Sequence, residues 1–327
     1  MPVLKVSELN VAFFTYYGVV RAVNGVSYDV SGNETLGIVG ESGSGKSVSA
    51  LAIMGLVEPP GFVVDGKIEI EGQDVLGFTE EAWYQTRGSK VGMCFQNPMR
   101  ALNPVLRIGH QLTRVHRKHK HSGKAEAWRH AVELLKAVNI PDAEQVMQRF
   151  PHQLSGGMCQ RVMIVMAISC DPALLILDEP TTGLDVTIQN QLLGLVRDLR
   201  ERGGSAQIII THDLGVIAKT CDRVVVMYAG HVMGEAEISS LFGRPLHPYT
   251  KALLESIPQI DRKMDLRPIP GSVPEALDLP SGCPFHPRCS HTMDVCRTEL
   301  PQLVVSDDGQ KVACHLYSRN EERGDLA

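Results

Sequence analysis

A glycine-rich loop at residues 40–47 constrains the fold more than any other feature, because it fits the pattern G-x-x-x-x-G-K-S/T. Glycines let successive backbone N–H groups turn toward an anion, and a helix that begins at such a loop adds the positive end of its dipole. The apolar run before the loop, residues 35–39, has the composition of a buried strand. The order strand, loop, helix therefore predicts a phosphate-binding loop made of Gly40, Glu41, Ser42, Gly43, Ser44, Gly45, Lys46 and Ser47.

This loop predicts ATP and Mg²⁺ as ligands, because a lysine placed like Lys46 neutralises the β- and γ-phosphates and a hydroxyl like that of Ser47 ligates magnesium. A second apolar strand, residues 174–177, ends in Asp178 and Glu179. The carboxyl ends of strands are where ligands bind in open α/β folds. We expect Asp178 to hold the magnesium shell and Glu179 to polarise the attacking water. Alternatively, the Asp178-Glu179 pair only caps a strand. The glycine-rich loop motif at residues 40–47 makes this alternative the weaker one.

The composition narrows the class of protein. The chain has 327 residues and a formal net charge of −5, with no long basic run, so nucleic acid is not an expected partner. No segment approaches the roughly 18 consecutive apolar residues that span a bilayer. The N-terminal residues lack the pattern of a secretory signal. We therefore expect the chain to stay in the cytoplasm.

The hydrophobic pattern predicts a mixed α/β core. Four short apolar runs are typical of parallel strands buried on both faces, at residues 35–39, 174–177, 208–210 and 224–227. Residues 4–14 and 23–30 alternate apolar and polar side chains, as antiparallel strands with one wet face do. Helical periodicity over residues 125–138 indicates an inserted helical subdomain at about 97–155. Prolines gather after Leu241, so we expect one domain over 1–245 and a small irregular one over 246–327.

Residues 154–161, Leu-Ser-Gly-Gly-Met-Cys-Gln-Arg, resemble the signature motif of the ATP-binding subunits of ABC transporters. The resemblance extends from residue 3 to about residue 240 and implies a P-loop NTPase core of the ABC type. It also implies a second anion cradle at a helix start, formed by Ser155, Gly156 and Gly157, with Gln160 in the same motif. In this family the cradle grips the γ-phosphate bound by the partner subunit.

The other family elements occur in the expected order. Gln96 resembles the glutamine that senses magnesium and the γ-phosphate, and His212 resembles the switch histidine. Asp185 belongs to a segment that resembles the loop crossing the dimer interface. Tyr17 lies where the family places an aromatic ring that stacks on adenine. Tyr16, Phe14 and Phe13 compete with Tyr17 for that role, and an aromatic side chain in a strand is often part of the core instead.

The resemblance implies a set of partners. Two ATP-binding subunits, here a related but non-identical pair, close on ATP beneath two membrane permease subunits, and an extracytoplasmic solute-binding protein delivers the solute. The chain would lie peripherally on the cytoplasmic face of the inner membrane. Residues 97–104 match the permease-facing segment except at Asn97, Arg100 and Ala101. The alternative is a soluble ABC-type ATPase, which usually carries a coiled-coil insertion or two cassettes in one chain.

The tail adds a solute class. Residues 246–254 and the proline-rich run that follows resemble the C-terminal extension of the di- and oligopeptide (and nickel) importers. This resemblance implies import of dipeptides or oligopeptides. Nickel or another non-peptide solute is the alternative within the same branch. On local pattern alone, residues 247–250 are also compatible with a plain turn before a helix.

Half of the eight cysteines lie in the tail, at Cys283, Cys289, Cys296 and Cys314. Four thiolates are enough to hold a 4Fe–4S cluster, and we expect one here because the spacing is wider than that of zinc ribbons. Structural Zn²⁺ and free cysteines without metal are the alternatives. Histidines that could replace a thiolate are His286, His291 and His315.

Overall fold

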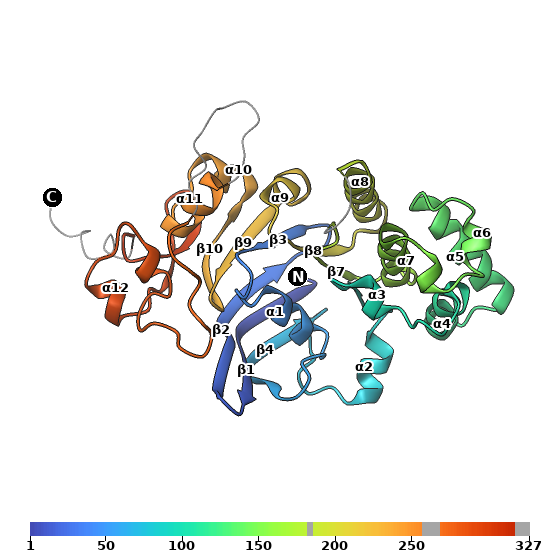
Figure 1. The fold of residues 1–327 in the computed structure, drawn as a ribbon, viewed down its shortest axis with the longest axis horizontal. Coiled ribbons are helices and arrows are strands. Elements are labelled where there is room, and N and C mark those ends of the chain that lie inside the picture. The colour runs from blue at the N-terminus through green and yellow to red at the C-terminus, as the bar shows by residue number, and fades with distance from the viewer. Residues whose placement is uncertain (182–185, 257–268, 318–327) are drawn as a thin grey trace. The chain divides into compact units, whose positions relative to one another are not determined.

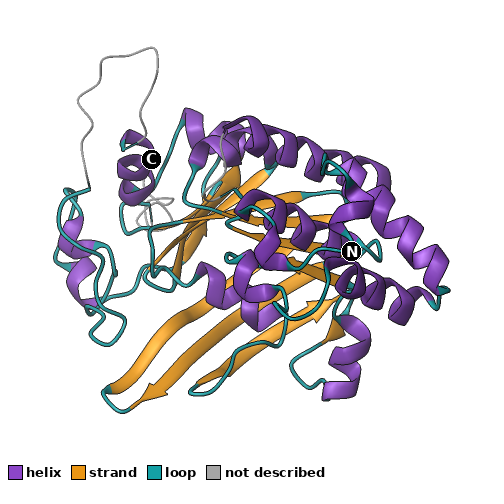
Figure 2. Ribbon diagram, turned by 45° about the vertical axis from the view of Figure 1, so that its right-hand side comes forward, coloured by secondary structure: helices purple, strands orange, loops and turns teal. Residues whose placement is uncertain are grey.

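The computed structural model describes residues 1–181, 186–256 and 269–317, and the rest is drawn in grey in Figures 1 and 2. The chain divides into two compact units whose segments alternate along the sequence. The first unit comprises residues 1–4, 29–35 and 69–210, and the second comprises residues 5–28, 36–68 and 211–327. Each unit is described by itself.

The first unit contains three buried parallel strands, in the order β6 (Val91–Cys94), β7 (Leu174–Asp178) and β8 (Ala206–Ile210). Val91 lies opposite Leu174, and Leu174 lies opposite Ala206. The short strand β5 (Gln73–Asp74) pairs with the last residues of β4 (Gly61–Ile70). The prediction of parallel strands at 174–177 and 208–210 is therefore confirmed.

Helices make up most of the rest of the first unit (Figure 1). α4, α5, α6 and α7 share one apolar core that includes Leu112, Leu135, Val146 and Val162. The helix predicted over 125–138 is observed as α5, and its predicted apolar face lies in this core with Trp128 at the margin. The helices are α2 (Glu80–Thr86), α3 (Pro98–Ala101), α4 (Ile108–Lys120), α5 (Lys124–Ala137), α6 (Ala143–Val146), η1 (Pro151–Gln153), α7 (Gly156–Ile168) and α8 (Val186–Gly203).

The second unit contains a sheet with the order β3 (Thr35–Val39), β9 (Arg223–Tyr228), β10 (His231–Glu237), β12 (Lys311–Ala313) and β11 (Leu303–Val305). β3 and β9 are parallel, as predicted for residues 35–39 and 224–227, and the later pairs are antiparallel. A separate sheet has the order β2 (Gly18–Val30), β1 (Leu4–Thr15), β4. A two-residue turn joins β1 to β2, so these strands form an antiparallel hairpin.

The tail is less irregular than we expect from its prolines. β12 adds to the edge of β10, where Gly234 lies opposite Val312. A strand edge left open has unpaired backbone groups, so pairing with a remote segment is favourable even where the local pattern is weak. The helices of this unit are α1 (Lys46–Ile53), α9 (Leu214–Thr220), α10 (Ile238–Gly243), α11 (Pro248–Glu255), η2 (His286–Arg288) and α12 (Val295–Thr298).

Among the described residues, no helix combines the length and apolar character needed to cross a membrane.

Candidate functional site

The predicted phosphate-binding loop joins β3 to α1 in the second unit, and its glycines are required by close backbone approaches. Gly45 has a φ of 93°, and a Cβ atom there would lie 2.3 Å from the carbonyl oxygen of Ala22. A Cβ atom on Gly40 would lie 2.1 Å from the carbonyl oxygen of Met227. Only glycine fits at either position. The loop is therefore packed directly against β2 and β9.

Lys46, at the start of α1, is buried and folds back over the loop. Its Nζ donates to the carbonyl oxygens of Gly40 and Glu41, both at 2.8 Å, and to Ser44 Oγ at 3.2 Å. Ser47 follows in the first turn of the helix. Backbone N–H groups at a helix start, one ammonium and one hydroxyl are the donor set that a nucleotide phosphate with Mg²⁺ requires. The residues present thus fit ATP and Mg²⁺.

Tyr17 lies in the turn between β1 and β2 and is 85% exposed. Its ring meets the even more exposed ring of Tyr16 edge to face, with centroids 5.6 Å apart. Phe14 packs instead against Phe62. The structure therefore places Tyr17 and Tyr16 outside the core, where a ring is available for stacking on a ligand.

The first unit brings Gln96 and Glu179 together. Gln96 follows β6, Glu179 follows β7, and Gln96 Nε2 donates to Glu179 Oε2 at 2.9 Å. Glu179 has a φ of 48°, and its backbone N–H donates to the carbonyl oxygen of Ile210 at 2.8 Å. Asp178, the last residue of β7, is buried. Two carboxylates and one amide thus meet at the carboxyl ends of parallel strands.

The signature segment forms an exposed helix start in the same unit. Ser155 is the N-cap of α7, and its Oγ accepts from the backbone N–H of Met158 at 3.3 Å. Space is open beside Gly156, since a Cβ atom there would meet nothing within 4 Å. Gly157 follows in the first turn. This end of α7 offers free space next to helix N–H groups, as an anion site requires.

Gln160 of the same motif lies elsewhere. Its side chain is buried, and Nε2 donates to Cys94 Sγ at 3.3 Å. Burial, together with the nearby charge of Asp178, raises the pKa of the Cys94 thiol, so that thiol is neutral. The structure therefore does not bring Gln160 to the exposed start of α7 with Ser155 and Gly156.

One further predicted residue, His212, follows a strand. His212 is exposed and stands between Thr211, whose N–H donates to the carbonyl oxygen of Ile38 at 3.2 Å, and Asp213, which caps α9. His212 belongs to the second unit, whereas β8 before it belongs to the first. Asp185 lies outside the described residues.

The prediction of a 4Fe–4S cluster in the tail is wrong. Within the described residues, no group of three or more His, Cys, Asp or Glu side chains is arranged to hold a metal ion, and this finding applies to the zinc alternative as well. Cys283, Cys296 and Cys314 are buried, and Cys289 is half-buried. Cys314 packs as a small apolar side chain in a cluster with Leu246 and Val312.

Burial raises the pKa of the Cys283 thiol to about 11, and the neighbouring thiols add to the rise. The predicted substitute ligands have other partners: His286 Nδ1 lies 3.0 Å from the carbonyl oxygen of Cys283, and His315 Nε2 lies 2.9 Å from that of Glu299.

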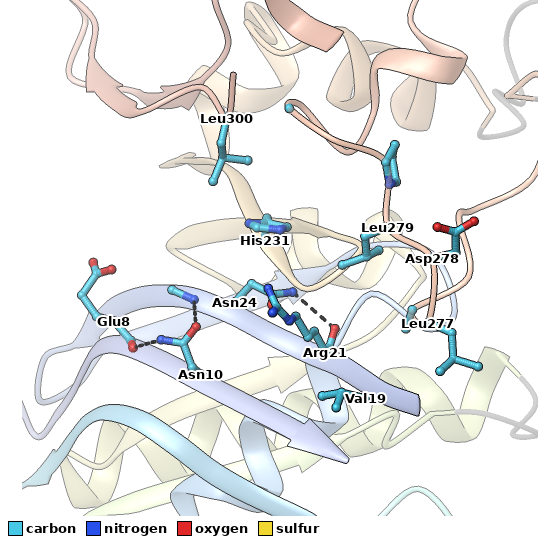
Figure 3. Close-up of a pocket in the computed structure, with 14 residues that line it drawn as sticks. Glu8, Asn10, Val19, Arg21, Asn24, His231, Leu277, Asp278, Leu279 and Leu300 are labelled. Carbon is cyan, nitrogen blue, oxygen red and sulfur yellow. Dashed lines mark hydrogen bonds between the residues drawn. The ribbon is translucent and has the colours of Figure 1, made fainter. Parts of the chain in front are cut away.

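A cavity of about 740 Å³ lies in the second unit between β1, β2 and the tail (Figure 3). Its wall carries polar side chains from both strands, among them Arg21 and Asn24, and faces Asp278 of the tail. Burial lowers the pKa of His231 in this wall to about 4, so this imidazole is neutral at pH 7. No residue predicted to bind nucleotide belongs to its lining.

Two family models match this chain. Residues 23–182 match the model described as "ABC transporter", and residues 233–296 match "Oligopeptide/dipeptide transporter, C-terminal region". The first match contains the phosphate loop, Gln96, the signature segment and both carboxylates. The second contains most of β10, all of α11 and the first three cysteines of the tail.

Curated relatives match over nearly the whole chain. The oligopeptide transport ATP-binding protein AppD of Bacillus subtilis (strain 168) is 51% identical, covering 98% of this chain and 98% of the relative. The oligopeptide transport ATP-binding protein OppD of Salmonella typhimurium is 46% identical, covering 95% and 92%. The dipeptide transport ATP-binding protein DppD of Escherichia coli (strain K12) is 45% identical, covering 96% and 97%.

Solved structures share the fold. The dimeric, post-hydrolysis ATP-binding cassette MJ0796, bound to ADP and Pi, has a TM-score of 0.66 and 25% identity, covering 72% of this chain and 98% of that one. CbiO1 of Clostridium perfringens, part of the transporter complex cbiONQ, has a TM-score of 0.61 and 26% identity, covering 74% and 91%. These likenesses confirm the predicted ABC-type P-loop fold.

Proposed function

This chain belongs to the ATP-binding subunits of ABC transporters, and we propose from that premise that it hydrolyses ATP to power the import of dipeptides or oligopeptides. The match of residues 233–296 to the peptide-transporter C-terminal region supports the solute class. The names of the relatives, which cover almost the full chain, agree with it and favour peptides over nickel. The full-length matches also favour a transporter subunit over an ATPase unconnected with transport.

The observation that carries the hydrolytic activity is the hydrogen bond between Gln96 and Glu179, at the end of the strand that also presents Asp178. Glu179 acts as the base that takes a proton from water, and Gln96 orients its carboxylate. Asp178, Gln96 and Ser47 are the residues that would hold Mg²⁺, which supplies neutralising charge for the phosphates. His212 completes the set of proposed catalytic residues.

The loop residues bind the nucleotide in this proposal. Gly40 to Gly45 present their N–H groups to the phosphates, Lys46 contributes its positive charge, and Tyr17 stacks on adenine. The exposed start of α7 offers helix N–H groups to an anion, and the solved cassette resembling this chain is a dimer. We therefore assign Ser155, Gly156 and Gly157 to the ATP bound by a neighbouring subunit, with Asp185 at the interface.

The proposed assembly has a second, related ATP-binding subunit, two membrane permease subunits and an extracytoplasmic solute-binding protein. The chain lies on the cytoplasmic face of the membrane, and residues 97–104 face the permease. The catalytic domain covers residues 1–245 with a helical subdomain at about 97–155, and residues 246–327 are an extension of the peptide-importer type.

Glu179→Gln tests the hydrolytic assignment. The amide is isosteric but is a much weaker base, so we expect ATP turnover to fall by about 100-fold or more while ATP binding stays within about threefold of the unchanged chain. Glu144→Gln, at an exposed position on α6, is the matched control and should change neither quantity. Single-turnover hydrolysis and equilibrium nucleotide binding measure the two effects. Normal turnover by the Glu179 variant would exclude this residue as the base.

A vesicle assay tests the transport assignment. Membrane vesicles that contain the permease, with this chain on the side where ATP is supplied, should accumulate a labelled dipeptide only when ATP is present. Uptake that is independent of this chain, with the solute-binding protein supplied, would refute the proposal.

A further inference from the structure

Arg288, in the cysteine-rich tail, makes a buried ion pair with the phosphate loop. Its side chain is 5% exposed and lies in the short helix η2. Nη1 donates to Glu41 Oε2 at 2.7 Å and Nη2 donates to Glu41 Oε1 at 3.2 Å. Two parallel bonds of this kind fix both the position and the plane of a carboxylate. Glu41 is the second residue of the phosphate loop, and it is separated from Arg288 by 247 positions in the sequence.

The remaining donors of Arg288 are also used. Nη1 donates to Tyr228 Oη at 3.1 Å, and Nε donates to the carbonyl oxygen of Pro270 at 2.7 Å. The guanidinium carbon lies 5.7 Å from the centre of the Tyr228 ring. A guanidinium held at this many points has little freedom to follow a moving partner, so the position of Glu41 is set by the tail.

Tyr249 holds the same loop residue by its backbone. The N–H of Glu41 donates to Tyr249 Oη at 2.9 Å, and Tyr249 is fully buried in α11. The rings of Tyr249, Tyr228 and Phe285 pack together with centroid distances of 4.7 to 5.3 Å. This aromatic cluster thus connects α11 and β9 with the cysteine segment, residues 282–296. Two of its rings belong to Tyr249, which bonds to Glu41, and to Tyr228, which bonds to Arg288.

The tail also touches the hairpin that carries Tyr17. The N–H of Arg21 on β2 donates to the carbonyl oxygen of Ala276 at 3.3 Å. A Cβ atom on Gly18, the residue after Tyr17, would lie 3.3 Å from Leu277 Cδ2. The tail therefore contacts both elements of the second unit to which the proposed function assigns the nucleotide.

A carboxylate in an anion-binding loop is an electrostatic liability, because it repels the phosphates that the loop must attract. We propose that Arg288 is a positioning residue of the phosphate loop: it neutralises Glu41 and, with Tyr249, holds that residue on the tail so that the loop keeps its phosphate-binding conformation. The inference rests on the proposed function, since it concerns the same nucleotide site. The tail is then a working part of the ATP site.

The test compares nucleotide binding by Arg288→Gln, Glu41→Gln and the double variant in the full chain, with a fluorescent ATP analogue and Mg²⁺ as the probe. Arg288→Gln leaves the Glu41 charge unpaired, so affinity should fall by about tenfold. Glu41→Gln removes the charge but keeps an oxygen that can accept from the guanidinium, so it should lose less affinity than Arg288→Gln does. The double variant should recover most of the affinity that Arg288→Gln loses.

Two further measurements separate positioning from mere docking of the tail. Hydrogen exchange of the amides of residues 40–47, in the chain without nucleotide, should be faster in Arg288→Gln than in the unchanged chain. Arg288→Lys keeps the charge but loses the two parallel hydrogen bonds to Glu41, so its affinity for the ATP analogue should lie between those of Arg288→Gln and the unchanged chain. If Arg288→Gln does not fold, Arg288→Lys provides the test. Arg244→Gln is the matched control, because Arg244 makes an ion pair with Asp308 of the tail and its side chain is exposed.

Two results would overturn the proposal: wild-type affinity in both Arg288→Gln and Arg288→Lys, or a double variant no better than Arg288→Gln. If Arg288→Gln does not fold, wild-type affinity in Arg288→Lys is enough. Failure of the unchanged chain to bind the ATP analogue would instead refute the proposed function, so the two failures are distinguishable.

Discussion

The phosphate loop and the cysteine segment each contain a tight turn that requires glycine, but the side chains that follow the two turns differ in chemistry. Gly45 and Gly282 both have positive φ angles, and a Cβ atom on either would collide with a carbonyl oxygen, that of Ala22 at 2.3 Å and that of Cys296 at 2.4 Å. In the phosphate loop, the turn at Gly45 is followed by the start of α1 and the ammonium group of Lys46. In the cysteine segment, the turn at Gly282 precedes Cys283, whose thiol is kept protonated by burial.

The difference shows what each motif constrains. A motif defined by glycines specifies the backbone conformation, because only glycine tolerates those φ angles and such close contacts with neighbouring backbone atoms. A motif written in cysteine spacing specifies only a side-chain type, and the surroundings then decide whether the sulfur is a ligand or a packing atom. The first therefore predicted a geometry, whereas the second predicted a metal site for which the described residues form no ligand group.

Gly45→Ala should break the loop and has the largest expected effect. The new methyl group would meet the carbonyl oxygen of Ala22 at a φ that L-residues avoid, so we expect a loss of about 3 kcal/mol in stability. ATP affinity should fall by about 100-fold or more, because the helix start shifts away from its anion-binding position. Thermal unfolding and equilibrium nucleotide binding measure both.

Gly43→Ala is the matched control for stability. Gly43 has a φ of +79°, but a Cβ atom there would meet nothing within 4 Å, so the loss in the chain without nucleotide should be only about 1 kcal/mol. Equal losses for the two variants would mean that φ alone, and not the contact with β2, makes glycine necessary in this loop.

His247 caps α11, the helix whose Tyr249 contacts both the phosphate loop and Phe285 of the cysteine segment. Its Nδ1 accepts from the N–H of Tyr249 at 3.0 Å, and Tyr249 in turn bonds to the loop and packs on Phe285. Burial lowers the pKa of His247 to about 4 from an unfolded value of 6.5. The folded chain therefore binds fewer protons than the unfolded chain, so this stability is present above pH 6.5 and is lost as the pH falls toward 4.

We expect the chain to lose about 2 kcal/mol between pH 7 and pH 5 from this group alone. His231 titrates in the same window, so the comparison with His247→Asn isolates the contribution of His247. Asparagine keeps an acceptor for the cap of α11 but has no proton to bind. Denaturant unfolding at both pH values measures the difference, and parallel pH profiles for the two proteins would contradict the assignment.

Serine substitutions sharpen the interpretation of the cysteines and have the smallest expected effects. Cys314 is buried in an apolar cluster, so Cys314→Ser should cost about 1.5 kcal/mol. Cys289 is half-buried, and its Sγ accepts from the N–H of His291 at 3.4 Å, a bond that a hydroxyl can replace. Cys289→Ser should therefore cost less than about 0.5 kcal/mol. Equal costs would contradict the difference in burial on which this prediction rests.

Local features were predictable from the sequence. The buried parallel strands β3, β7, β8 and β9 and the helix α5 follow from short apolar runs and helical periodicity, which depend on neighbours in the chain. The hydrogen bond between Gln96 and Glu179 was half predicted. Each residue was expected to serve the same reaction, but the direct bond between them depends on the pairing of β6 with β7.

Contacts between remote segments were not predictable. The pairing of Glu41 with Arg288 spans 247 positions, and neither residue belongs to a periodic pattern that would identify its partner. The strands β11 and β12 have three residues each, too few to give a signal in a proline-rich tail. The metal prediction failed for a related reason, since burial of a thiol depends on segments that come from elsewhere in the chain.

The position of β12 beside β10 has a consequence for the synthesis of the chain. β10 ends at Glu237, and its partner begins only at Lys311. At about 5 to 20 residues per second, the ribosome needs roughly 4 to 15 seconds to deliver that partner. During this interval the outer edge of β10 has open backbone donors and acceptors, which another nascent chain could pair with. The newborn chain is therefore exposed to edge-to-edge aggregation until this late strand has been made.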